Sequence, residues 1–174
     1  MFKARKFLPA RLFAGLIFAC LLVVGGCSQN SGEPEIYQSL ASGNVQLNAN
    51  EARNIINQYR QSLGLASLTL DPVLMAEADQ HARDMASQDE VGHNVSSRGG
   101  FAARIRNSGV QRAHTAENVG AGYHTIAQAF SGWRGSPNHD RNMRSSESRR
   151  MGIAAAYNAQ SKYKVFWVLI VTSD

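Results

Sequence analysis

The sequence predicts an α+β domain in which helices cover both faces of a mainly antiparallel sheet. Two observations lead to this prediction. Apolar residues recur at helical spacing through most of the chain, but this period is lost near the end. There, residues 152–157 and 163–172 are short apolar runs separated by the turn-forming segment 158–161, which is typical of a hairpin. Because residues 163–172 are apolar on both alternating faces, helices are expected on both sides of the sheet.

Two helices are expected in the first half of the domain. Asn48, with Glu51 three residues later, resembles a capping box, and Gly64 supplies a stop. A second helix is expected to open at Asp71 and Pro72, an N-cap residue followed by proline at the first helical position. The apolar positions of the first helix are Ala52, Ile55, Ile56, Tyr59 and Leu63.

Further elements follow with weaker signals. Residues 97–107 are expected to hold a short helix. Thr125 and Gln128 are spaced to cap another helix. Before Thr125, residues 118–122 are rich in small residues, so we expect a tight turn directly after Glu117. The apolar stripe of the helix after Thr125 is Ile126, Phe130 and Trp133.

The N-terminus predicts export. A positively charged leader precedes an apolar run at residues 12–24, which has the length of a signal peptide rather than of a membrane span. Small residues directly before Cys27 resemble a bacterial lipobox, which implies removal of residues 1–26 and lipidation of Cys27. Since Ser28 is not aspartate, the anchored lipoprotein is expected in the outer membrane of a cell with two membranes. The alternative is an ordinary signal peptide or a short anchor, with Cys27 incidental.

The chain after the signal peptide divides into a tether and a domain. Residues 27–46 are polar, contain Gly, Ser and Pro, and show no useful periodicity. We therefore interpret them as the lipidated cysteine and a flexible tether. Residues 47–174 suit one domain of ordinary size.

Charge and cysteine content exclude several kinds of protein. The net charge of +5 depends on the leader, which holds four of the 18 basic residues. From Cys27 onward there are 14 basic and 13 acidic residues, so we expect no nucleic-acid partner. Apart from Cys27 this part contains no cysteine, which excludes disulfides within the domain and cysteine-ligated zinc.

Three residues far apart in the sequence are candidates for a functional site: His93, Glu117 and His139. Imidazole and carboxylate groups bind divalent metals and transfer protons near neutral pH. Asn118 and Asn142 lie close to two of them and are expected to bond local backbone or line the same cleft. His81 lies beside the apolar stripe of its helix and is expected to be a packing residue.

Several stretches resemble the CAP superfamily, the cysteine-rich secretory, antigen 5 and pathogenesis-related proteins, in its bacterial branch. They occur in the family's order and extend over roughly residues 47–172. The stretch LTLDPVLMAEADQHARDMAS is similar to the family's second helix. The other similar stretches are His93 to Arg104, Ala116-Glu117-Asn118, Ser136 to Asn142, and Met151-Gly152-Ile153-Ala154.

The resemblance implies a three-layer α-β-α sandwich and a site built on His93 and His139. These histidines could bind zinc or another divalent ion, with water completing the coordination, or they could hold loops in place. Glu117 could be a metal ligand, an orienting partner of a histidine or a general base, and we favour an orienting or structural role. The chain departs from the family at Ser136, where eukaryotic members often have a second glutamate.

Three functions remain open from the sequence. The preferred one is a binding module for a lipid, a small apolar molecule or a component of the cell envelope, as the resemblance implies. The second is a metal-dependent hydrolase of peptides or envelope polymers, with Glu117 as the base that activates a metal-bound water. The third is a structural envelope protein. The common hydrolase motifs are absent from the sequence, so we lean against an enzyme.

Overall fold

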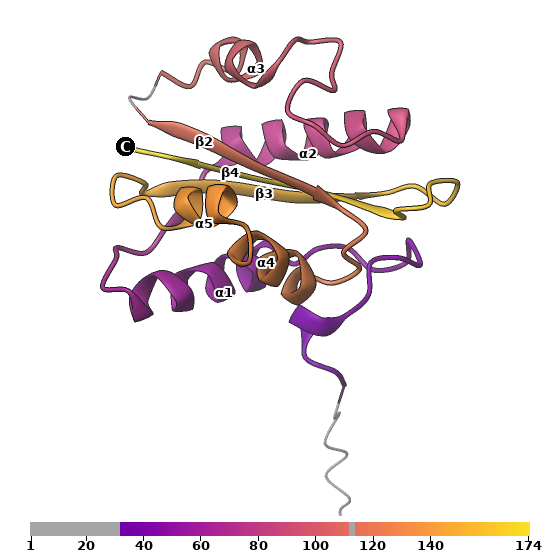
Figure 1. The fold of residues 1–174 in the computed structure, drawn as a ribbon, viewed down its shortest axis with the longest axis horizontal. Helices are drawn as coiled ribbons and strands as arrows, with labels where there is room; N and C mark the ends of the chain where they lie inside the picture. Colours follow the sequence, from indigo (N-terminus) through magenta and orange to yellow (C-terminus); the bar gives the residue numbers. More distant parts are fainter. Residues whose placement is uncertain (1–31, 112–113) are drawn as a thin grey trace, which may run out of the picture. The chain divides into compact units, whose positions relative to one another are not determined.

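The computed structural model describes residues 32–111 and 114–174. The predicted signal peptide, Cys27 and the beginning of the tether lie outside the described residues. The described part contains one sheet between two layers of helices, which confirms the predicted α-β-α sandwich (Figure 1). None of its helices is long and apolar enough to cross a membrane.

The sheet has four strands in the order β1-β3-β4-β2. The predicted hairpin is confirmed: β3 (Arg150–Tyr157) pairs antiparallel with β4 (Val165–Thr172), and all eight residues of β4 are buried. β2 (Thr115–Ala121) pairs antiparallel with the other side of β4, while the short β1 (Thr69–Leu70) runs parallel to the start of β3. Because β4 is buried on both faces, a layer of helices must cover each face of the sheet.

The predicted turn at residues 118–122 is wrong. Residues Asn118 to Ala121 belong to β2, with Asn118 opposite Leu169 and Gly120 opposite Trp167. Only Gly122, with a φ of +82°, leaves the strand. The small residues serve packing instead: a Cβ on Gly120 would crowd the ring of Tyr123 and the indole of Trp133.

The helix starts follow the predicted caps. The side chains of Asn48, Asp71 and Thr125 accept hydrogen bonds from backbone N–H groups in the first turns of α1 (Ala49–Ser62), α2 (Pro72–Gln88) and α4 (Ile126–Arg134). The predicted helix within residues 97–107 is the shorter α3 (Phe101–Asn107). The sequence did not predict α5 (Pro137–Met143) or the 3₁₀ helix η1 (Glu35–Tyr37).

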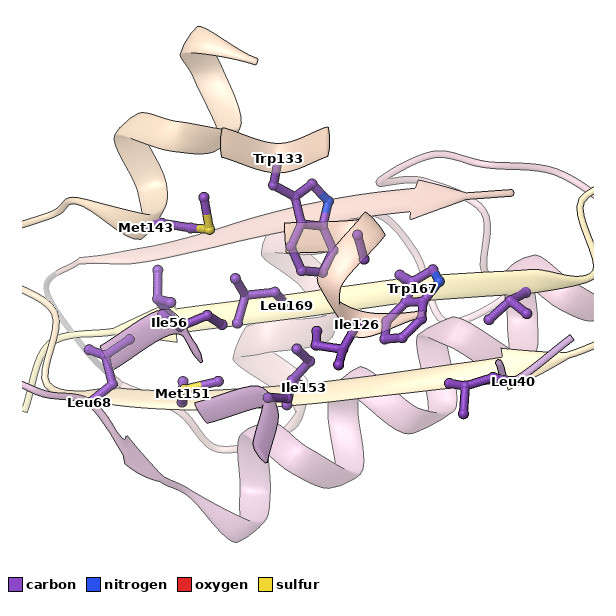
Figure 2. Close-up of a cluster of buried hydrophobic side chains, with 14 residues drawn as sticks. Leu40, Ile56, Leu68, Ile126, Trp133, Met143, Met151, Ile153, Trp167 and Leu169 are labelled. Atoms are coloured by element: carbon purple, nitrogen blue, oxygen red, sulfur yellow. The ribbon is translucent and has the colours of Figure 1, made fainter. Parts of the chain in front are cut away.

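The two layers of helices bury different cores. α1, α4 and α5 lie on one face of the sheet, and α2 and α3 lie on the other (Figure 1). Figure 2 shows the first core, where Trp133 and Trp167 lie among side chains of β3, α1 and α4. On the other face, the backbone of α2 packs closely against β3 at Gly152. A Cβ at this position would collide with the backbone of Leu74.

Part of the segment that we expected to be tether packs against the domain. Leu40 is buried in the first core (Figure 2). Its backbone N–H donates a hydrogen bond of 2.8 Å to the carbonyl of His124. Ile36, Ala41 and Val45 are partly buried against the same core. Sequence periodicity could not reveal these contacts, since the apolar residues are not regularly spaced in this segment. The packed part of the chain therefore begins before residue 47.

Candidate functional site

Glu117 lies at the centre of a buried ionic network on the α2 and α3 side of the sheet. It projects from β2 and meets Arg104 of α3, whose Nη2 lies 2.9 Å from Oε2 and 3.0 Å from Oε1. Nη1 of the same guanidinium donates to Glu77 of α2 at 2.7 Å. The side chain of Arg104 has no exposed surface, so its charge is balanced by these buried carboxylates rather than by water.

Glu117 also fixes the orientation of His93. Nδ1 of His93 lies 2.9 Å from Oε1 of Glu117. A carboxylate only accepts hydrogen bonds, so Nδ1 carries the proton and Nε2 of the neutral ring keeps a free lone pair. The imidazole is 49% exposed whereas the carboxylate is 1% exposed. The buried acid thus presents a histidine to solvent.

The loop that bears His93 is tied down at several points. Nη2 of Arg104 donates to the backbone carbonyl of His93 at 3.2 Å, and Nε2 of His81 lies 3.0 Å from the carbonyl of Gly92. Farther along, Arg98 bridges Glu77 at 2.7 Å and Asp84 at 3.1 Å. These contacts hold both the backbone and the side chain of His93 to α2 and α3.

His139 reaches the site from the other layer of helices. It lies on α5, which starts at Pro137, and its ring is partly buried. Two asparagines attach α5 to β2: Nδ2 of Asn118 donates to the carbonyl of His139 at 3.0 Å, and Nδ2 of Asn142 donates to Oδ1 of Asn118 at 2.8 Å. Burial, and then the charge of His93, lower the pKa of His139, so its ring stays neutral to a lower pH than usual.

The structure connects the residues that the sequence singled out for the site, some through side chains and His139 through its backbone. His93 touches Glu117 directly. His139 is connected through the backbone contacts of Asn118, and Asn142 also donates to the carbonyl of Glu117 at 3.3 Å. The assignment of a function to these residues stays a prediction.

Sequence reasoning missed three members of the network: Glu77, His81 and Arg104. We expected His81 to be a packing residue, and it is fully buried, but its Nε2 also lies 3.9 Å from Oε1 of Glu117. Burial lowers its pKa, which favours the neutral ring. One signal could have found two of them: Glu77 and His81 are four residues apart and interrupt the apolar face of a helix.

The geometry limits how the site could hold a metal ion. Within the described ranges, no three or more His, Cys, Asp or Glu side chains are grouped as ligands for an ion. Both oxygens of Glu117 face Arg104, so this carboxylate is not a free ligand. Nε2 of His93 and the ring of His139 remain as nitrogen donors, and metal binding by them stays a prediction.

The family of the chain follows from its sequence and fold together. The family model CAP, described as the cysteine-rich secretory protein family, matches residues 53–171. The chain therefore belongs to the CAP family, as the motifs predicted. No match was found among the curated proteins.

Solved structures of bacterial proteins share the fold. An extracellular protein with an SCP domain from Bacillus anthracis has a TM-score of 0.62 at 21% identity, covering 72% of this chain and 40% of its own. An outer surface protein from Borrelia burgdorferi has a TM-score of 0.63 at 17% identity, covering 74% of this chain and 97% of its own. A cysteine-rich secretory protein from Staphylococcus aureus has a TM-score of 0.58 at 18% identity, covering 71% and 37%. This chain thus spans about two fifths of the length of the Bacillus and Staphylococcus proteins.

Proposed function

We propose that the protein is an exported lipoprotein, anchored through Cys27, whose CAP domain is a binding module. The ligand site is the surface around His93 and His139, and the ligand is a lipid, a small apolar molecule or a component of the cell envelope. Export is supported by the leader and lipobox, and by the extracellular and outer-surface relatives that share the fold.

One observation carries the choice of a binding module over a hydrolase. Glu117 is buried, faces the guanidinium of Arg104 with both oxygens, and accepts a hydrogen bond from Nδ1 of His93. A general base needs an oxygen that can reach water and take a proton near neutral pH. A carboxylate held by a buried cation serves instead to orient the histidine, as carboxylates do behind histidines that bind ligands or metals.

A divalent ion such as zinc is compatible with this module. His93 would offer Nε2, since Nδ1 is committed to Glu117, and His139 would offer a ring that burial keeps neutral. When bound, the ion would supply a positive centre for a carboxylate or phosphate group of the ligand. Asn118 and Asn142 would keep His139 in place through their contacts with its helix.

Metal affinity of residues 28–174, prepared without affinity-tag histidines, tests the site. Calorimetry with Zn²⁺ is expected to show one ion per chain in the wild type and none with His93→Ala/His139→Ala. The matched control is His114→Ala/His124→Ala, which removes the same number of histidines outside the site. Equal binding by both double variants would contradict a site at His93 and His139.

Glu117→Gln separates the binding module from the hydrolase. The amide keeps the shape of the side chain and can still accept from His93, so a binding module retains ligand and metal binding within a few fold. A hydrolase that uses Glu117 as its base retains metal but loses turnover of peptide or envelope-polymer substrates. Such a loss of turnover would overturn the proposal.

The lipid anchor has a separate test. Cells that express the full chain are grown with labelled palmitate. Label is expected on the wild type and on Cys20→Ser, which changes the other cysteine of the chain, within the predicted signal peptide. Cys27→Ser is expected to lose it. Label that survives Cys27→Ser would show that Cys27 is not the site of lipidation.

A further inference from the structure

One edge of the sheet lacks a neighbouring strand along most of its length. β1 pairs with β3 only at Arg150 and Met151. From Ile153 to Tyr157, β3 has β4 on one side and, among the described residues, no strand on the other. An open edge of this kind presents backbone donors and acceptors that another chain can pair with.

The direction of these backbone groups follows from the hydrogen bonds nearby. The carbonyl of Met151 accepts from the N–H of Asp71 on the β1 side, and the N–H of Ile153 points to Sδ of Met75 at 3.2 Å. Because alternate residues of a strand direct their backbone groups to the same side, the N–H and C=O of Ala155 and the N–H of Tyr157 face away from β4. In the described ranges, no side chain or loop is hydrogen-bonded to these groups of Ala155.

A groove of about 480 Å³ runs along this edge. One wall is a single face of α2, formed by Met75, Asp79 and Arg83 at intervals of four residues, and the other is the segment from Leu40 to Ala49. Asp79 and Arg83 form an ion pair of 2.7 Å, so their charges balance within the wall. The rest of the lining from β3 and the N-terminal segment is largely apolar.

We propose that this groove is a peptide-binding site, in which an extended segment of a partner protein pairs with Ile153–Tyr157 as an additional strand. The groove is separate from His93 and His139 and does not depend on the function proposed for those residues. Strand addition uses main-chain hydrogen bonds for affinity and alternate side chains for specificity. The groove accommodates roughly four to five residues at the rise of an extended chain, uncharged and apolar at alternate positions.

The backbone groups decide between an extended peptide and other occupants. An acyl chain would fill the apolar walls but would leave the N–H and C=O of Ala155 buried without partners, which is unfavourable. A second copy of the domain would have to bring its own β3 edge into the groove, and the walls from α2 and residues 40–49 flank that edge in both copies. A single extended strand pairs with the backbone groups of Ala155 and also fits between the two walls of the groove.

The test uses the full-length chain, ¹⁵N-labelled and held in detergent micelles, with the peptide acetyl-Lys-Val-Thr-Val-Thr-Val-Lys-amide as the probe. Addition of the peptide is expected to slow amide hydrogen exchange of Ala155 and Tyr157 at least tenfold.

The same peptide with N-methyl groups on alternate amides, in both registers, is expected to bind at least tenfold more weakly. Gln46→Trp, at an exposed position of the groove, is expected to weaken binding to the same extent, whereas Gln58→Trp on α1 leaves it unchanged.

Three results would overturn the proposal. Exchange at Ala155 and Tyr157 that is unaffected by millimolar peptide would show that the edge does not pair. Equal affinity for the N-methylated peptides would show that side-chain contacts alone hold the peptide. Protection of the same amides without peptide, increasing with protein concentration, would identify a second copy of the chain as the occupant.

Discussion

Two fully buried arginines stabilise opposite layers of this molecule by different means. Arg104, on the α2 and α3 side, faces the carboxylates of Glu77 and Glu117. Arg60, on the α1 side, has no carboxylate partner among the described residues and donates only to backbone carbonyls. Its contacts include Ala66 at 2.8 Å, Met143 at 2.7 Å and Ser145 at 2.9 Å.

The difference shows what each arginine organises. Arg104 holds a side chain, Glu117, which in turn orients His93, so its layer builds the candidate site. Arg60 holds the backbone that leads from α5 into β3 and therefore fixes the position of a strand. Burial, and then the charge of Arg149, lower the pKa of Arg60, whereas the charge of Arg104 is balanced locally. The comparison predicts unequal costs when each is removed.

The largest effect is expected from Arg104→Leu. It leaves Glu117 buried without its cation, while Glu77 keeps only Arg98. Breaking a buried pair in this way costs about 3–5 kcal/mol. Urea denaturation measures the loss, with Arg106→Leu, an exposed arginine on the same helix, as the control. If Arg104→Leu lost no more stability than Arg106→Leu, the network would not stabilise this layer.

A smaller loss is expected from Arg60→Lys. The ammonium keeps the charge but cannot reach all the carbonyls that the guanidinium fork satisfies, and unpaired buried acceptors cost about 1–3 kcal/mol. The same denaturation experiment applies, with Arg53→Lys on α1 as the control. A loss as large as that of Arg104→Leu would erase the distinction between the two layers.

Arg98→Gln refines the comparison within the layer of α2 and α3. Arg98 binds Glu77 and Asp84 but is 35% exposed, so solvent screens its ion pairs. We expect a loss of at most about 1 kcal/mol, decreasing as salt is added. Arg83→Gln, an exposed ion-pair variant on α2, is the control, and a salt-independent loss would contradict this account.

The smallest effect is a pH dependence that belongs to His81. Burial lowers the pKa of His81 in the folded state below the ordinary value of 6.5. The unfolded chain then binds more protons as the pH falls below that value, so this contribution to stability is complete above it and is lost at lower pH. His81→Gln is expected to flatten the decline in unfolding free energy between pH 7.5 and 5, whereas His124→Gln, at an exposed position, is not. Parallel curves for wild type and His81→Gln would contradict the assignment.

The sequence predicted what local chemistry determines. The caps at Asn48, Asp71 and Thr125 depend on neighbours within one turn, and all three hold. The segment after Glu117 did not follow its local signals, because pairing with β4 overrides the turn preference of small residues. Periodicity located β3 and β4, but it could not assign their free edge.

The candidate site was predictable only in its outline. Motifs identified His93, Glu117 and His139, but motif spacing contains no information about which side chains meet. The roles of Arg104 and Glu77 depend on contacts between residues 27 and 13 positions apart in the chain. The packing of Leu40 could not be predicted either, since a polar segment offers no periodic signal around it.

Both proposed sites depend on the close packing of α2 against β3 at Gly152. With no side chain there, α2 rests directly on β3 at Leu74. One side of α2 contributes Glu77 and His81 to the network behind His93, and another contributes Met75, Asp79 and Arg83 to the groove. A single methyl group at position 152 would push α2 away from β3. It would therefore displace the residues that α2 contributes to both sites at once.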